Sequence, residues 1–170
     1  MKRPLIIAAA LSTACACAGA GGPEPVPEGA ENPIVIEFRS ATPPDAVEVI
    51  ARALSDEGIG PQEVDPEGYV ETRWIDIAAW VRGVQAEAYP IRERMVQYRF
   101  EVTEAEEGAR RLTIAAYYQP NRPQGVVLQA SKTYDRLVPT DHPAYQLALK
   151  LRTRIRTGLR GLGATLVEGG

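Results

Sequence analysis

Alternating apolar and polar residues predict an antiparallel hairpin in the centre of the chain. Between Met95 and Val102, and again between Leu112 and Tyr118, every second residue is apolar. Successive side chains of a strand point to opposite faces, so each segment presents one apolar face. The acidic stretch Glu104–Gly108 between them favours a turn, and together the segments predict a hairpin. Three further strands are predicted at Ile34–Arg39, Tyr69–Ile75 and Val126–Thr133.

Apolar residues three or four positions apart predict two helices. Thr42 and Asp45 have the spacing of a capping box, and the two prolines between them fit a first helical turn. This helix is predicted to end near Glu57, and a second helix to run from Pro143 to about Gly158. Their apolar stripes are Val47, Ile50, Ala51 and Leu54 in the first helix and Ala144, Leu147, Ala148, Leu151 and Ile155 in the second.

The order of these elements predicts an α+β fold, β-α-β-β-β-β-α. We expect an antiparallel β-sheet of about four to six strands with two helices packed on one face, because this arrangement buries both apolar stripes. Residues 77–90, which include Trp80, are predicted to be an irregular excursion between strands. A single domain is assigned to residues 34–163, and residues 164–170 are predicted to be a flexible tail.

The first seventeen residues have the pattern of an export signal. Lys2 and Arg3 precede an apolar run that is too short to span a bilayer, and small residues follow it. The two cysteines of the chain, Cys15 and Cys17, lie in this region, which resembles a lipoprotein signal. We predict lipidation of one of the two and favour Cys15. The alternative is cleavage after Ala20, which would give a soluble secreted or periplasmic protein.

Residues 18–33 are predicted to be a tether. They are small, proline or acidic except for Val26, so they have almost nothing to bury. Fully extended, sixteen residues reach roughly 50 Å at ~3.1 Å each. No aspartate follows either cysteine, and in familiar lipoproteins this favours the outer membrane. The expected location is therefore the periplasmic face of that membrane, which the chain contacts through its lipid anchor.

Charge is distributed unevenly along the chain. The net charge of the 170 residues is −3, which gives no reason to expect nucleic acid as a partner. Residues 142–167 nevertheless hold five bases and no acid. Three of these bases, Arg152, Arg156 and Arg160, have a spacing that places them along one exposed face of the second helix. They are candidates for binding anionic headgroups or an acidic partner, and the alternative is an ordinary solvated face.

One connected pattern resembles a known family. It consists of the helix face Val47-Ile50-Leu54, the helix end Glu57-Gly58-Ile59 and the acidic turn within Val64–Val70. The pattern is similar to the repeated domain of the BamC (NlpB) lipoproteins, which are accessory parts of the outer-membrane β-barrel assembly machinery. The resemblance covers about residues 34–160 in the order of elements. It implies one domain of the helix-grip type and an accessory role in outer-membrane assembly.

The residues that could carry chemistry have few partners. His142, the only histidine, directly precedes the second helix, so we favour a turn or capping role over that of a general base or metal ligand. Glu104, Glu106 and Glu107 lie at the predicted hairpin tip, where solvated carboxylates are expected. We therefore expect no catalytic residue, no metal site, no cofactor and no enzymatic activity. Four aromatic residues are candidates either for a groove or, as we favour, for the core and its edge: Tyr69, Trp74, Trp80 and Tyr89.

These features predict a non-catalytic envelope lipoprotein that acts as a membrane-tethered, protein-binding adaptor. The signal, the tether and the scarcity of catalytic groups are the observations behind this expectation. The alternative is a periplasmic carrier of a small apolar ligand or lipid. That function requires an apolar pocket of several hundred Å³ (order of magnitude) beneath the second helix.

Overall fold

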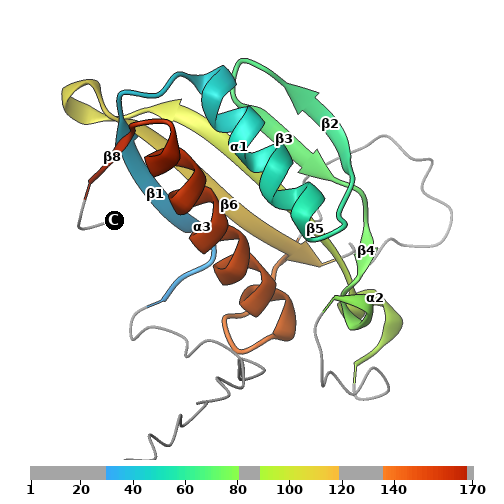
Figure 1. Cartoon of the computed structure of the whole chain (residues 1–170). Helices are drawn as coiled ribbons and strands as arrows, with labels where there is room; N and C mark the ends of the chain where they lie inside the picture. The colour runs from blue at the N-terminus through green and yellow to red at the C-terminus, as the bar shows by residue number, and fades with distance from the viewer. Residues whose placement is uncertain (1–29, 81–88, 119–135, 168–170) are drawn as a thin grey trace, which may run out of the picture.

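The computed structural model describes residues 30–80, 89–118 and 136–167. In these ranges eight strands form one antiparallel sheet, and helices α1 (Pro43–Asp56) and α3 (Pro143–Gly161) lie side by side across one of its faces (Figure 1). A four-residue helix, α2 (Ile91–Arg94), precedes the longest strand. The strands are β1 (Ile34–Arg39), β2 (Pro61–Asp65), β3 (Tyr69–Thr72), β4 (Ile75–Asp76), β5 (Met95–Glu104), β6 (Arg110–Tyr118), β7 (Arg136–Leu137) and β8 (Thr165–Leu166).

The predicted α+β class, with two helices on one face of an antiparallel sheet, is confirmed. The main strand order is β2-β3-β5-β6-β1-β8, while β4 pairs with β5 and β7 with β6. The described sheet has more strands than the four to six expected. Strand β2 is exposed along its whole length and shows no apolar alternation, and three other strands have only two residues each. Such segments leave no periodic signal in the sequence.

The predicted hairpin is formed by β5 and β6, whose register runs from Val96 opposite Tyr118 to Glu104 opposite Arg110. Even-numbered residues of both strands face the helices, and Tyr98 and Phe100 are completely buried there. The Tyr98 hydroxyl donates a 2.8 Å hydrogen bond to the carbonyl oxygen of Ala144. This bond ties the first turn of α3 to the middle of the sheet.

The capping box predicted for α1 is confirmed. The amide of Thr42 donates to Asp45 Oδ2 at 2.8 Å, and the amide of Asp45 donates back to Thr42 Oγ1 at 3.3 Å. The Thr42 hydroxyl also donates to Asp45 Oδ2 at 2.6 Å, and this bond, followed by that from the Thr42 amide, lowers the pKa of Asp45. The helix ends at Asp56, with Gly58 in the left-handed region at φ 70°. A 2.9 Å bond from the amide of Ile59 to the carbonyl of Leu54 then closes this end.

The prediction of a flexible tail from residue 164 is wrong for the described part of that tail. Helix α3 continues past Gly158 to Gly161, and the chain reverses at Gly163, where φ is +85°. Strand β8 then pairs with β1, and the amide of Val167 donates to the carbonyl of Glu37 at 2.9 Å. The pairing occurs because β1 would otherwise leave a row of unpaired backbone groups at that edge.

The end of the predicted tether also belongs to the domain. The Asn32 side chain donates to the carbonyls of Ala116 and Val138, at 2.9 and 2.7 Å, and accepts from the amide of Ala116. The Tyr145 hydroxyl donates to the carbonyl of Glu31 at 3.1 Å. Residues 30–33 are therefore held by hydrogen bonds, which composition alone did not indicate. Residues 18–29, the two cysteines and the predicted strand at 126–133 lie outside the described residues.

Trp80 closes one end of the core. The predicted strand Tyr69–Ile75 is divided into β3 and β4, and a short 3₁₀ helix at Ile77–Ala79 follows. The half-buried Trp80 packs against the core and donates from its indole nitrogen to the carbonyl of Glu57 at 2.7 Å. The interpretation of Trp80 as a core-edge residue is thus confirmed, while residues 81–88 of the excursion lie outside the described ranges. Among the described residues, every helix is too short or too polar to cross a membrane.

Candidate functional site

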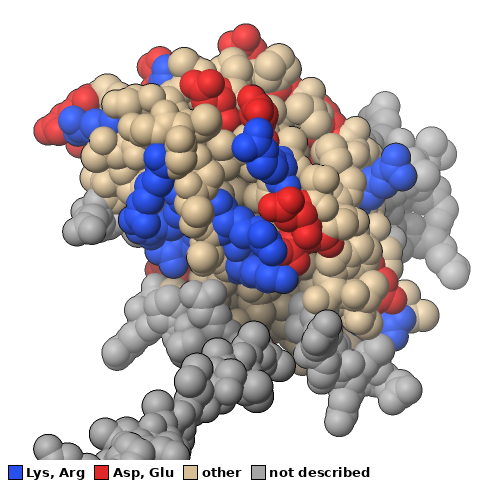
Figure 2. Space-filling model, viewed as in Figure 1, with Lys and Arg blue, Asp and Glu red and all other residues tan. Residues whose placement is uncertain are grey.

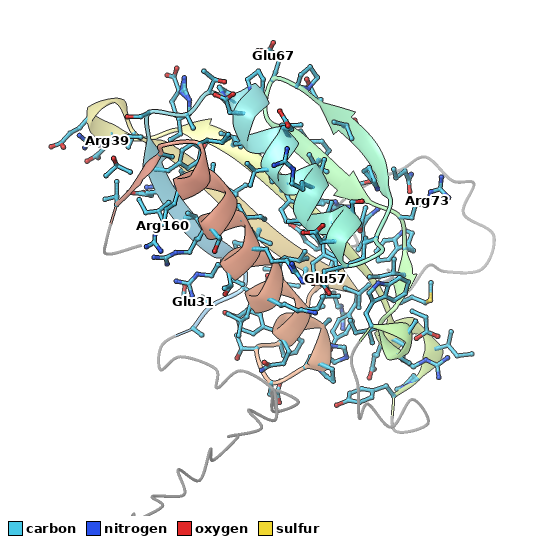
Figure 3. The ribbon with its side chains drawn as sticks, viewed as in Figure 1. Glu31, Arg39, Glu57, Glu67, Arg73 and Arg160 are labelled. Carbon is cyan, nitrogen blue, oxygen red and sulfur yellow. The ribbon has the colours of Figure 1, made fainter. Side chains whose placement is uncertain are left out.

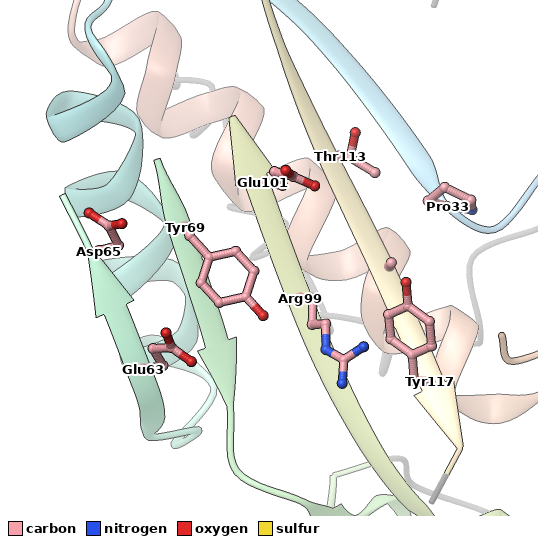
Figure 4. A pocket seen from close by; sticks show the side chains of 9 residues that line it. Pro33, Glu63, Asp65, Tyr69, Arg99, Glu101, Thr113 and Tyr117 are labelled. Carbon is pink, nitrogen blue, oxygen red and sulfur yellow. The ribbon is translucent and has the colours of Figure 1, made fainter. Parts of the chain in front are cut away.

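The sheet face turned away from α1 and α3, here called the far face, carries a hollow of about 550 Å³. The alternation that directs Tyr98 and Phe100 to the helices directs the odd-numbered residues of β5 and β6 to this face. Figure 4 shows the Arg99 guanidinium between the rings of Tyr69 and Tyr117, with each residue on a different strand. The lining also includes the acidic residues Glu63, Asp65 and Glu101.

Arg99, which lines this hollow, forms an ion pair with Glu71. Arg99 Nε donates to Glu71 Oε2 at 2.7 Å, and the two side chains are only 13% and 10% exposed. A second Arg99 nitrogen donates to Gln97 Oε1 at 3.0 Å, and the guanidinium carbon lies 4.4 Å from the centre of the Tyr117 ring. These contacts fix the Arg99 side chain and stack it on an aromatic ring.

Tyr69 completes this network. Its hydroxyl donates a 2.7 Å hydrogen bond to Glu71 Oε2, the atom that also accepts from Arg99. Burial, assisted by the Glu71 hydrogen bond, raises the pKa of Tyr69 far above its ordinary value, so the hydroxyl remains protonated. The charge of Arg99 is balanced inside the network, whereas Glu63, Asp65 and Glu101 are exposed around it. The hollow thus combines fixed aromatic and guanidinium groups with an acidic surround, an arrangement suited to binding.

His142 has the capping role that was predicted. It is the N-cap of α3, and its Nδ1 accepts a 3.1 Å hydrogen bond from the amide of Ala144. The ring is 4% exposed and lies edge-on to the rings of Tyr89 and Tyr118, with centroids 5.0 and 5.1 Å away. Since Nδ1 accepts, the neutral ring carries its proton on Nε2, a buried atom without a hydrogen-bond partner.

Acid is expected to weaken the fold through His142. Burial lowers the pKa of His142 below its ordinary value of 6.5, although Glu93 and Asp141 oppose the shift. Below about pH 6.5 the unfolded chain takes up a proton that the folded chain refuses, so the free energy of unfolding falls until the lowered pKa is reached. The largest slope is about 1.4 kcal/mol per pH unit.

Urea unfolding of the wild type and His142→Asn between pH 7.5 and 5 measures this effect. Asparagine retains a capping oxygen but does not titrate, so the free energy of unfolding of the variant should fall less steeply below pH 6.5. The variant should be less stable overall, because it loses the ring contacts with Tyr89 and Tyr118. Equal slopes in the two proteins would contradict the assignment.

The basic residues of α3 lie in two rows on opposite flanks of the helix. Lys150 and Arg154 face α1, where both pair with Glu57 at 2.6 Å, and Arg154 also pairs with Asp56 at 3.4 Å. This row agrees with the solvated, partly neutralised face that was the alternative interpretation. Figure 2 shows that Lys and Arg gather over α3, with acidic side chains beside part of them.

The second row consists of Arg152, Arg156 and Arg160, here called the arginine row. Only Arg160 is exposed, whereas Arg152 and Arg156 are half-buried, so the prediction of one exposed face was wrong in part. The reason is that the row borders the apolar stripe of α3, so Arg152 and Arg156 are partly covered by neighbouring residues. The Nε atom of Arg152 is buried without a hydrogen-bond partner.

The second hollow, of about 350 Å³, lies between α1 and α3 and includes Val49, Arg52, Thr153 and Gly158 in its lining. Neither of the two hollows lies beneath α3. The core there is filled by side chains such as Phe100, Leu151 and Ile155, which are completely buried. These two hollows therefore give no support to the carrier hypothesis.

The carboxylates of the acidic hairpin tip are exposed to solvent, as was predicted. Glu104 ends β5, and Glu106 and Glu107 lie in a 3₁₀ turn, all three exposed. Glu107 pairs with Arg39 at 2.9 Å. Among the described residues, no group of three His, Cys, Asp or Glu side chains could hold a metal ion.

Sequence reasoning named Tyr69 as a groove candidate but favoured a core or edge position for it, and it missed the partners of Tyr69 on the far face. Glu71, Arg99 and Tyr117 were not among the candidates, although two of them are charged residues in the middle of predicted strands. A charged residue in the middle of a strand is a signal that could have been used, because charged side chains are seldom buried unless they are paired. What remained hidden was that the network would join three strands.

Comparison of the chain with known proteins gives no family assignment: no protein-family model and no curated protein matches it.

Proposed function

We propose that the protein is a non-catalytic, membrane-tethered adaptor of the bacterial cell envelope that binds a protein partner on the far face of its sheet. The proposed anchor is a lipid on Cys15 or Cys17, at the periplasmic face of the outer membrane. The resemblance to the BamC domain makes the outer-membrane assembly machinery the first partner to test. The observation that carries the proposal is the far-face hollow with its Arg99–Glu71 network.

The chemistry of the hollow favours a protein surface as its ligand. Tyrosine and arginine are enriched in protein interfaces, where each combines a large contact area with a polar end. Here Arg99 is held by Glu71, Gln97 and the Tyr117 ring before any partner arrives. Side chains that are already ordered lose little entropy on binding.

Site-specific photo-crosslinking in the native envelope tests this proposal. A photoreactive residue in place of Thr113, which lines the hollow, should give one defined protein adduct. The matched control replaces Thr157, which lies on α3 beside the second hollow and should give no such adduct. In the Thr113 background, Tyr117→Ala should lower the adduct yield about tenfold, because it removes an aromatic contact. Equal adducts from both positions, or none from Thr113, would contradict the proposal.

The anchor has its own measurement, so that the two parts of the proposal can fail separately. Mass spectrometry of the mature N-terminus should find an acylated cysteine, at position 15 or 17. A mature chain that begins at Gly21 without an acyl group would refute the anchor and leave the crosslinking result standing.

A further inference from the structure

We propose that the arginine row binds the phosphates of anionic lipid headgroups and turns the β1 flank of α3 toward the membrane. This inference rests on the proposed tether for its biological setting. It adds a second contact with the membrane that the lipid anchor does not supply, and an orientation for the domain.

The two basic rows of α3 lie on opposite flanks of the helix. Lys150 and Arg154 lie toward Glu57 and satisfy its buried carboxylate, which is a contact within the fold. The arginine row lies on the opposite flank, because its positions are offset from those of Lys150 and Arg154 around the helix. Figure 3 shows Arg160 on the β1 side of α3 and Glu57 on the α1 side.

The chain enters the domain on the same flank as the arginine row. Glu31 is held there by the hydrogen bond from the Tyr145 hydroxyl, and Arg152 is close enough to Tyr145 to oppose the rise in the pKa of its hydroxyl. In Figure 3 the labels of Glu31 and Arg160 lie on one side of α3. Glu31, the second residue of the described chain, therefore lies on the flank of α3 that carries the arginine row.

The row has the geometry of a headgroup contact. At ~1.5 Å rise per residue, its three side chains are spread over about 12 Å of helix. Guanidinium groups bind phosphate oxygens through two parallel hydrogen bonds, and the half-buried side chains of Arg152 and Arg156 have less freedom to lose on binding. The proposed anchor, Cys17 or Cys15, lies 13 or 15 residues before Ala30, so the membrane stays within about 40 to 47 Å at ~3.1 Å per residue. At such a short tether length even weak headgroup affinity is effective.

Vesicle sedimentation of the full chain tests the inference, because it does not depend on acylation. The readout is a ratio: binding to vesicles that contain phosphatidylglycerol, divided by binding to neutral phosphatidylcholine vesicles. Residues 1–17 are the same in all variants, so they contribute equally to each ratio. Arg152→Gln/Arg156→Gln/Arg160→Gln should lower this ratio about 100-fold at low salt, since each basic residue near an anionic surface contributes about one factor of five. Raising the salt should weaken wild-type binding.

Two control variants separate placement from net charge and from folding. Arg52→Gln/Arg73→Gln/Arg111→Gln removes the same charge from other surfaces and should leave the ratio within about twofold. Replacing the arginine row with lysine keeps the charge and should retain most of the binding; circular dichroism confirms that each variant is folded.

Equal losses in the two glutamine variants would overturn the proposal. A wild-type protein that binds both vesicle types equally would also overturn it. The same holds for a wild-type protein that does not bind anionic vesicles but binds an acidic protein through the arginine row. Failure of the anchor alone, seen by mass spectrometry, would leave the vesicle result unchanged.

Discussion

Glu71→Ala is expected to lower the free energy of unfolding by about 3 kcal/mol. The substitution leaves the Arg99 guanidinium in the far face without its carboxylate, and removing one member of a buried ion pair costs about 3–5 kcal/mol. The low end applies because Arg99 keeps its hydrogen bond to Gln97. Tyr69 also loses the acceptor of its hydroxyl. Urea unfolding at pH 7 measures the change.

The matched control for this prediction is Glu101→Ala, since Glu101 is an exposed acid on the same face of β5. Its effect should stay within about 0.5 kcal/mol. Glu71→Gln keeps an acceptor oxygen for both donors and should fall between the two. A loss below 1 kcal/mol (about the value of one neutral hydrogen bond) in Glu71→Ala would show that the ion pair does not support the fold.

Gly158→Val is expected to destabilise the contact between α1 and α3 by up to about 3 kcal/mol. A Cβ atom at position 158 would lie 2.6 Å from Val49 Cγ1, which is closer than two non-bonded carbon atoms approach in proteins. Val49 is buried and branched at Cβ, so its side chain cannot easily turn away. Overpacking of this kind costs about 1–3 kcal/mol, and valine adds two methyl groups beyond the clashing atom.

Gly161→Val is the control on the same helix, because nothing lies within 4 Å of a Cβ atom built there. Urea unfolding should find it close to wild type. Val49→Ala in the Gly158→Val background should restore part of the lost stability, since it removes the methyl groups that the new side chain meets. Additive effects of the two substitutions would argue that the close approach at Gly158 does not limit the packing.

The features that sequence reasoning found are those formed by neighbouring residues. The capping box of Thr42 and Asp45, the β5–β6 hairpin and the apolar stripe of α3 appear where the pattern places them. His142 likewise has the capping role that its place before Pro143 indicated. Each depends on contacts within a few residues or on a regular period, and a single sequence carries that information.

The tail and the tether show where local information ends. Thr165–Leu166 has no strand pattern of its own, yet it pairs with β1 because the end of α3 brings it to a free sheet edge. Asn32 has the sequence surroundings of a polar linker, yet its side chain donates hydrogen bonds to the carbonyls of Ala116 in β6 and Val138 just after β7. In both cases the partner lies far away along the chain, and composition says nothing of it.

The sequence by itself therefore determined the α+β class, the hairpin, the helix caps and the apolar faces, because short-range periodicity and steric preference set them. Only the tertiary structure decided that Arg99 meets Glu71, 28 residues earlier, and that the bases of α3 divide between two flanks. Strand order and register decide which side chains share a face, and the rotation of a packed helix decides which neighbours each residue meets. Both are settled by the burial of the whole core, and no local pattern records that choice.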